Sequence, residues 1–448
     1  MMGLGRERSV TGADRHQAVF NAAEDGGMRP LHISVVTETY PPEVNGVATT
    51  LARVVEGLRA QGHTVGLVRP SQPADAREGR GAHTGPTRRP SDEGAMAGLE
   101  RLVAGLPIPR YPHLRMGLPA GGVLRELWST HRPDVVHVAT EGPLGFSAVQ
   151  AARTLGLPVT SDFRTNFHAY TGHYGIGWLK HPILAYLRSF HNRTAATMVP
   201  TAALASRLQA EGFERLHVVS RGVDVGRFDP ARRSAALRAE WGVRDDEPVA
   251  LYVGRLAAEK NLELLVRAFR TAQASAPAAR LVIVGDGPMR AALQAAVPEA
   301  HFAGQRLGTD LAAHYASADL FLFPSLTETF GNVVAEAMAS GLAVVSYDYA
   351  AGAELIESGL DGILVACDNE VQFQRSAAAL AASAPMRRTM GQRARVRACA
   401  NGWPAVLARF EGVLQQAIRG DSDGVGLDTD ASGQGAAAST APTPVWLR

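Results

Sequence analysis

Two glutamates, Glu328 and Glu336, lie eight residues apart after an apolar run, Leu320–Phe323, that predicts a buried strand. Residues 333–339 have the pattern of a helix, so one carboxylate precedes this helix and the other lies on it. The residues that join the strand region to the helix and surround its start are Phe330, Gly331, Asn332 and Val333. Free backbone N–H groups at a helix N-terminus bind anions, most often phosphate. The Glu328 carboxylate, before the helix, can bind sugar hydroxyls. The Glu336 carboxylate, about two turns further on, can bind a ribose.

Two cationic side chains, Arg255 and Lys260, follow a second predicted strand at residues 248–254. Open α/β sheets bind ligands beyond the carboxyl ends of their strands, so both cations are placed to contact a ligand there. A guanidinium and an ammonium at such a site can stabilise a diphosphate as it leaves. The same spacing also occurs among solvated surface charges, and the two residues alone leave both interpretations open.

The elements that must position these groups alternate between strands and helices. Residues 32–38 and 64–68 predict strands, and residues 47–60 between them predict a helix with an apolar face. A strand, a helix and a strand of these lengths form a right-handed βαβ unit. No Gly-x-Gly-x-x-Gly follows the first strand, which argues against an NAD-dependent dehydrogenase. The length of 448 residues accommodates two domains, each with its own core.

Short motifs in both halves of the chain resemble those of the retaining glycosyltransferases of family 4. They are the Glu-x7-Glu spacing with its flanking Pro-Ser, Glu-Thr-Phe-Gly and Ala-Met-Ala-Ser-Gly, the Gly-Arg-Leu…Glu-Lys-Asn of residues 254–261, and the Gly-Val-Asp of residues 222–224. The resemblance covers roughly residues 31–418. It implies the α/β GT-B fold, in which two Rossmann-like doubly wound domains face a cleft.

The resemblance also implies a division of the chain. We expect a flexible extension at residues 1–30, an acceptor domain at 31–220, a hinge at 221–230, a nucleotide-sugar domain at 231–401, and a disordered tail at 420–448. A helix at residues 402–418 is expected to pack back on the first domain.

Roles for individual residues follow from the same resemblance. Glu328 would orient sugar hydroxyls, Glu336 the ribose, and Arg255 and Lys260 the leaving diphosphate. The remaining substrate-binding positions lie in three places. Phe330, Gly331, Asn332 and Val333 surround the helix start described above, and Asn45 and Gly46 lie in the loop after the first strand. Arg306 and Leu307 lie in a loop that is expected to contact the base through its backbone. No Asp-x-Asp lies at the site, so we expect neither a metal nor a cofactor, and the nucleotide-diphosphate sugar is a co-substrate.

One position departs from the family pattern. Relatives have a histidine in the active cleft where this chain has Arg164, and His168 follows four residues later. An arginine does not release a proton at neutral pH, so Arg164 either binds a phosphate or an acidic sugar or pairs with Asp162. His168 would then take the place of the missing histidine, or would be a loop histidine bonded to backbone. Both residues are retained as candidate catalytic residues.

Charge and composition limit the partners and the location. The net charge of +2 gives no whole-chain field for nucleic acid, but residues 31–215 carry 19 Lys and Arg against 14 Asp and Glu. Residues 170–195 combine aromatic, basic and glycine residues, which is typical of an interfacial segment and equally of an ordinary packed helix. The chain has no run long enough to span a membrane and only two cysteines. We expect a cytoplasmic protein, with peripheral contact to anionic lipid on the inner face of the cell membrane.

The sequence thus predicts a retaining hexosyltransferase that uses a nucleotide-diphosphate sugar and a lipid or glycan acceptor. The favoured reaction is α-mannosyl transfer from GDP-mannose. The alternatives are a UDP-sugar-dependent glycosyl- or sulfoquinovosyl-diacylglycerol synthase, a phosphorylase-like enzyme with a pyridoxal-phosphate lysine, and a catalytically silent GT-B binding protein.

Overall fold

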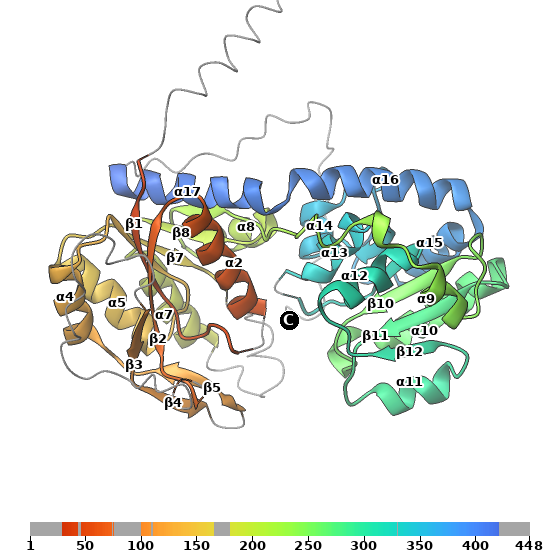
Figure 1. The fold of residues 1–448 in the computed structure, drawn as a ribbon, viewed down its shortest axis with the longest axis horizontal. Coiled ribbons are helices and arrows are strands. Elements are labelled where there is room, and N and C mark those ends of the chain that lie inside the picture. Colours follow the sequence, from red (N-terminus) through yellow and green to blue (C-terminus); the bar gives the residue numbers. More distant parts are fainter. Residues whose placement is uncertain are drawn as a thin grey trace, which may run out of the picture.

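The computed structural model describes residues 29–43, 46–73, 75, 100–108, 111–164, 180–328 and 330–420. Within these ranges the chain forms two parallel β-sheets, each with its own helices, and Figure 1 shows them side by side. The predicted α/β class with two Rossmann-like domains is confirmed.

The first sheet has the strand order β3-β2-β1-β6-β7-β8-β9, and all its pairs are parallel. Its strands are β1 (His32–Val36), β2 (Thr64–Pro70), β3 (Glu100–Val103), β6 (Val135–Val138), β7 (Val159–Asp162), β8 (Ala196–Val199) and β9 (Leu216–Val218). Several of these strands are buried along their whole length, as expected for a parallel sheet that helices cover on both faces.

Among the described residues, the helices that accompany this sheet are α2 (Gly46–Ala60), α4 (Gly121–Thr130), α5 (Pro143–Thr154), α7 (Lys180–His191) and α8 (Ala202–Ala210). In α2 the buried residues Leu51, Val54, Val55 and Leu58 follow the helical repeat, so one face of the helix packs on the sheet. β4 (Gly105–Ile108) and β5 (Tyr111–Gly117) pair antiparallel. From the sequence alone, residues 105–112 are expected only to form an extended, proline-stiffened segment.

The second sheet has the order β12-β11-β10-β13-β14-β15 and is also parallel. Its strands are β10 (Val249–Val253), β11 (Arg280–Val284), β12 (His301–Gly304), β13 (Leu320–Phe323), β14 (Ala343–Tyr347) and β15 (Ile363–Val365). Its helices are α9 (Ala235–Glu240), α10 (Leu262–Ser275), α11 (Arg290–Ala296), α12 (Gly308–Ser317), α13 (Asn332–Ala339), α14 (Ala351–Leu355), α15 (Glu370–Ala382) and α16 (Ala384–Ala400).

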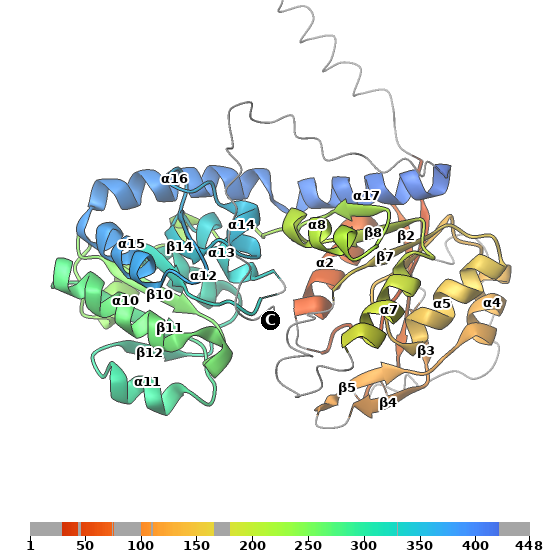
Figure 2. The same cartoon turned by 180° about the vertical axis from the view of Figure 1, so that it is seen from behind.

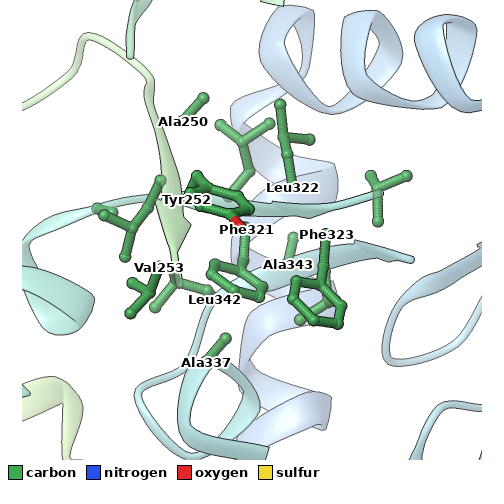
Figure 3. Packing of buried hydrophobic residues seen from close by; sticks show 14 of the residues in the cluster. Ala250, Tyr252, Val253, Phe321, Leu322, Phe323, Ala337, Leu342 and Ala343 are labelled. Atoms are coloured by element: carbon green, nitrogen blue, oxygen red, sulfur yellow. The ribbon is translucent and has the colours of Figure 1, made fainter. Parts of the chain in front are cut away.

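Aromatic side chains pack among aliphatic ones in the core of this second domain. Figure 3 shows Tyr252 of β10 beside Phe321 and Phe323 of β13, and the rings of Phe321 and Phe323 stack with centroids 5.9 Å apart. All three side chains are buried. This packing holds the carboxyl ends of β10 and β13 rigidly, and the loops that follow these two ends carry the candidate site.

The last helix, α17 (Trp403–Arg419), returns to the first domain. Leu407, Phe410 and Leu414 of α17 belong to the same buried cluster as side chains of β1 and α2. Figures 1 and 2 show α16 and α17 end to end along one side of both domains. A buried pair also ties α17 to the first domain, because His63 Nε2 lies 3.3 Å from Glu411 Oε1.

None of the helices that the structure describes is both long enough and apolar enough to cross a membrane.

Candidate active site

The loop between β13 and α13 brings Glu328 onto Lys260. Glu328 Oε1 accepts hydrogen bonds from Lys260 Nζ at 2.5 Å and from Ser325 Oγ at 2.9 Å. The two charged side chains are only 15% and 16% exposed. Lys260 ends a short 3-10 turn after β10, so two neighbouring strands each supply one partner. An ammonium has three donors, so Lys260 can hold Glu328 and bind a phosphate oxygen at the same time.

Arg255 lies further from this pair. Its guanidinium donates to Glu259 Oε1, and 67% of its side chain is exposed. Its carbonyl accepts a hydrogen bond from the buried Tyr252 hydroxyl at 3.3 Å, which fixes the backbone there. The structure therefore places Arg255 at the solvent edge of the site, with a side chain that can exchange Glu259 for another anion.

The N-terminus of α13 is open. Gly331 is its N-cap with φ 95°, a left-handed conformation that glycine adopts without strain, and no side chain among the described residues caps the helix. Phe330 before it is buried, whereas Asn332 and Val333 in the first turn are partly exposed. The N–H groups of Asn332 and Val333 have no acceptor among the described residues, and the helix dipole favours an anion there.

Glu336 lies one turn further along α13. Its Oε2 accepts a hydrogen bond from the Tyr315 hydroxyl at 2.9 Å. Burial raises the pKa of Glu336 to about 7, although the Tyr315 hydrogen bond and the positive charge of Arg227 act in the opposite direction. The second oxygen of this carboxylate remains able to accept a hydroxyl, which suits the predicted ribose contact.

The loop predicted to contact the base contains Arg306 and Leu307. Leu307 is exposed, and Arg306 bonds within its own segment, donating from Nε to Ala303 O at 2.8 Å and pairing with Asp310 at 3.2 Å. Both side chains are thus occupied or turned to solvent, which leaves the backbone of this loop as the part that can recognise a ligand.

The first domain contributes Gly46, the first residue of α2. A Cβ atom at Gly46 would lie 3.6 Å from Nη1 of Arg221, the residue at which the linker to the second domain begins. Asn45 lies outside the described residues. The N-terminus of α2 is therefore close to the linker, and both approach the second domain's site.

Arg164 pairs with Asp162 at the carboxyl end of β7. Its Nε donates to Asp162 Oδ2 at 2.7 Å, and its Nη2 donates to the same oxygen. His137 Nε2 lies 3.3 Å from that oxygen. Burial would raise the pKa of Asp162, but Arg164 and His137 overcome this effect and hold it well below its usual range. Of the roles considered for Arg164, the structure thus contains the ion pair; His168 lies outside the described residues.

Two groups near the site were not found by sequence reasoning. Arg221 was assigned only to the hinge, although a basic residue directly after a strand region at a domain boundary is a usable signal. Glu38 follows β1, and its Oε1 accepts a hydrogen bond from Leu144 N at 3.0 Å in the first turn of α5. Burial, with a contribution from the charge of Glu141, raises the pKa of Glu38 to about 7.

Metal ligands are a separate question. Among the side chains that the structure describes, no group of three or more His, Cys, Asp or Glu is arranged to hold a metal ion.

Comparisons with known proteins agree with this geometry. Residues 44–227 match the family described as Glycosyltransferase Family 4, and residues 247–383 match Glycosyl transferases group 1. A GDP-mannose-dependent alpha-mannosyltransferase of Mycobacterium tuberculosis is 36% identical over 335 residues, which cover 75% of this chain and 84% of the relative. An enzyme of the same name from Corynebacterium glutamicum is 30% identical over 429 residues, or 94% and 96% of the two chains.

A solved structure shows the same fold. HepE of Anabaena, in complex with UDP, has a TM-score of 0.66 with 16% identity, and the match covers 86% of this chain and 100% of HepE. The two family matches together take in every strand of both sheets except β1, and the relatives named above are transferases by name. The chain is therefore a glycosyltransferase that uses a nucleotide sugar, and it belongs to the group 1 glycosyltransferases of family 4.

Proposed function

We propose that this enzyme is a retaining transferase that moves an α-mannosyl group from GDP-mannose to a lipid or glycan acceptor. The observation that carries the proposal is the meeting of Lys260, Glu328 and the uncapped start of α13 at the carboxyl ends of β10 and β13. It combines donors for a diphosphate with an acceptor for sugar hydroxyls. The choice of GDP-mannose is supported by the relatives that share most of their length with this chain.

In the proposed reaction the bond between the anomeric carbon and the diphosphate oxygen breaks, and the diphosphate leaves with the electron pair. Lys260, Arg255 and the N–H groups of α13 stabilise the charge that develops there. The acceptor hydroxyl oxygen then bonds to the anomeric carbon on the same face, and its proton passes to an oxygen of the leaving phosphate. Glu328 orients the sugar hydroxyls, and Glu336 orients the ribose.

The acceptor would bind to the first domain, which we propose meets a lipid surface on the cytoplasmic side through α7. Tyr186 and Arg188 of α7 are exposed, and Arg188 Nη1 bonds to Glu211 O rather than to a carboxylate. Anionic vesicles should therefore sediment the protein and neutral vesicles should not. Binding to neither would leave the acceptor to be sought among soluble glycans, and equal binding to both would exclude recognition of anionic headgroups.

The decisive experiment measures donor binding and slow donor hydrolysis across GDP- and UDP-sugars. Wild type is compared with Glu328→Ala and with Glu370→Ala, which removes a carboxylate from an exposed ion pair of the same domain. We expect GDP to stabilise the wild type, GDP-mannose to be hydrolysed by the wild type and by Glu370→Ala, and Glu328→Ala to lose hydrolysis.

A preference for a UDP-sugar in this panel would mean that the donor is a UDP-sugar and not GDP-mannose. It would favour a glycosyl- or sulfoquinovosyl-diacylglycerol synthase. Binding of a nucleotide with no turnover of any sugar would favour a silent binding protein. Near-visible absorption of the purified protein would indicate pyridoxal phosphate and a phosphorylase-like enzyme.

A further inference from the structure

The linker between the domains carries Arg221, a cationic residue to which the proposed reaction assigns no role. The guanidinium carbon of Arg221 lies 5.7 Å from the centre of the Phe330 ring, and Nη1 lies close to Gly46. Phe330 directly precedes the N-cap of α13, and Gly46 is the first residue of α2. The side chain of Arg221 therefore lies where the N-termini of two helices, one from each domain, approach each other.

The backbone that carries Arg221 is firmly held. A Cβ atom at the next residue, Gly222, would lie 2.9 Å from the Cα of Trp403, so the linker packs directly on the start of α17. Val223 forms a parallel bridge with Gly402, the N-cap of the same helix. The guanidinium is thus presented from a fixed support and not from a mobile surface loop.

The guanidinium itself has no hydrogen-bond or ion-pair partner among the residues that the structure describes. The nearest acidic groups already have partners, because Asp162 binds Arg164 and Glu328 binds Lys260. Among the described side chains, Arg221 is therefore a further cation beside Arg164 and Lys260, which already bind these two carboxylates. Burial, together with the charge of Arg164, lowers the pKa of Arg221 to about 10, so the side chain keeps its charge at neutral pH.

We propose that Arg221 binds the diphosphate of the donor, as a third cation beside Arg255 and Lys260, supplied by the interdomain linker. A guanidinium binds two phosphate oxygens at once, and a planar fork over an aromatic ring is well suited to this contact. Because Arg221 also lies against α2, a diphosphate bound to it is held at the N-termini of both α2 and α13. The contact links donor binding to the relative position of the two domains. This inference rests on the nucleotide-sugar donor proposed above.

The test compares the affinities for GDP and GMP by titration calorimetry in wild type, Arg221→Gln, Arg221→Lys and Arg232→Gln. UDP and UMP replace them if the wild type prefers uridine. Arg232 is the matched control, an exposed arginine just after the linker that bonds to Gly226 O within it. We expect Arg221→Gln to lose about 10-fold or more in GDP affinity, the size of a charge-assisted hydrogen bond, and less than about 3-fold in GMP affinity. Arg221→Lys should lose several-fold because it cannot bind two oxygens in one plane, and Arg232→Gln should match the wild type.

Two results would overturn the inference. Unchanged GDP affinity in Arg221→Gln with reduced transfer would assign the guanidinium to an anionic acceptor group. Equal weakening of GDP and GMP would indicate a role in folding or domain placement only. If Arg221→Gln does not fold, an unchanged GDP to GMP ratio in Arg221→Lys has the same meaning. A wild type that binds neither GDP nor UDP would instead refute the proposed function.

Discussion

Replacing Glu328 with glutamine tests whether the Lys260–Glu328 pair is both a structural contact and part of the donor site. The carboxylate accepts two hydrogen bonds, at 2.5 Å from Lys260 and at 2.9 Å from Ser325, and the pair is largely buried. Glutamine keeps the shape but leaves the ammonium without its counter-charge. The pair is partly accessible, so we expect a loss of about 2 kcal/mol, below the cost of breaking a fully buried pair.

The assay is thermal unfolding with and without GDP. A loss of about 2 kcal/mol corresponds to a decrease in Tm of about 4–8 °C for a unit of 150–250 residues. GDP should then raise the Tm of Glu328→Gln more than that of the wild type, because the diphosphate becomes the partner of Lys260. Transfer should nevertheless fall by about 100-fold or more in kcat/KM, because the sugar loses its acceptor.

Glu370→Gln is the matched control. Its carboxylate pairs with Arg267 at 2.6 Å, but both side chains are almost half exposed, so the change should be within about 0.5 kcal/mol. The reasoning would be refuted if both variants lost the same stability, or if Glu328→Gln kept both its Tm and its turnover.

Three further predictions follow from the buried charges and close contacts. Arg164→Leu should lower the free energy of unfolding, measured with urea, by about 2–4 kcal/mol, because it leaves Asp162 with only His137 as a partner. Adding Asp162→Asn should restore part of this stability, and a single variant as stable as the wild type would contradict the ion-pair assignment. The pKa of Glu336 is raised from 4.5 to about 7, so between these pH values the folded state keeps a proton that the unfolded chain has released. The contribution of Glu336 to the free energy of unfolding therefore falls as the pH rises from 4.5 to about 7. In urea unfolding, the free energy of unfolding of Glu336→Gln should depend less steeply on pH than that of the wild type. An identical slope in both proteins would exclude the raised pKa. Gly391→Ala should lower the free energy of unfolding by about 1–3 kcal/mol, because its Cβ would lie 2.0 Å from a backbone oxygen. Gly412 has open space around it, so Gly412→Ala should raise this free energy by up to about 1 kcal/mol. Equal Tm values for the two variants would show that the contact at α16 is not tight.

Local patterns were sufficient for the elements that carry the site. The four apolar residues Leu320–Phe323 form β13 as predicted, because a parallel strand covered on both faces is apolar along its whole length. The helix expected at 47–60 is α2 (Gly46–Ala60), since its apolar residues recur on one face. A helix or strand whose pattern and physical cause are both local can therefore be predicted from the sequence.

Contacts between distant segments were not predictable in the same way. Lys260 and Glu328 are 68 residues apart, and they meet only because β10 and β13 are neighbours in the sheet. The sequence shows that Arg221 lies at a domain boundary, but the environment of its side chain comes from α2 and from Phe330, which are distant in the chain. The antiparallel pairing of β4 with β5 depends on which segments meet, and prolines within them obscured the strand pattern.

The return of α17 to the first domain has a consequence for how the protein is made. A ribosome completes the strands of the first sheet after about half of the chain, but the apolar face against which Leu407, Phe410 and Leu414 pack is then still uncovered. We expect the nascent first domain to remain incompletely folded, and a target for chaperones, until the last part of the chain emerges. A stop codon just before Trp403 would therefore damage the domain that is translated first, although it removes residues only from the opposite end of the polypeptide.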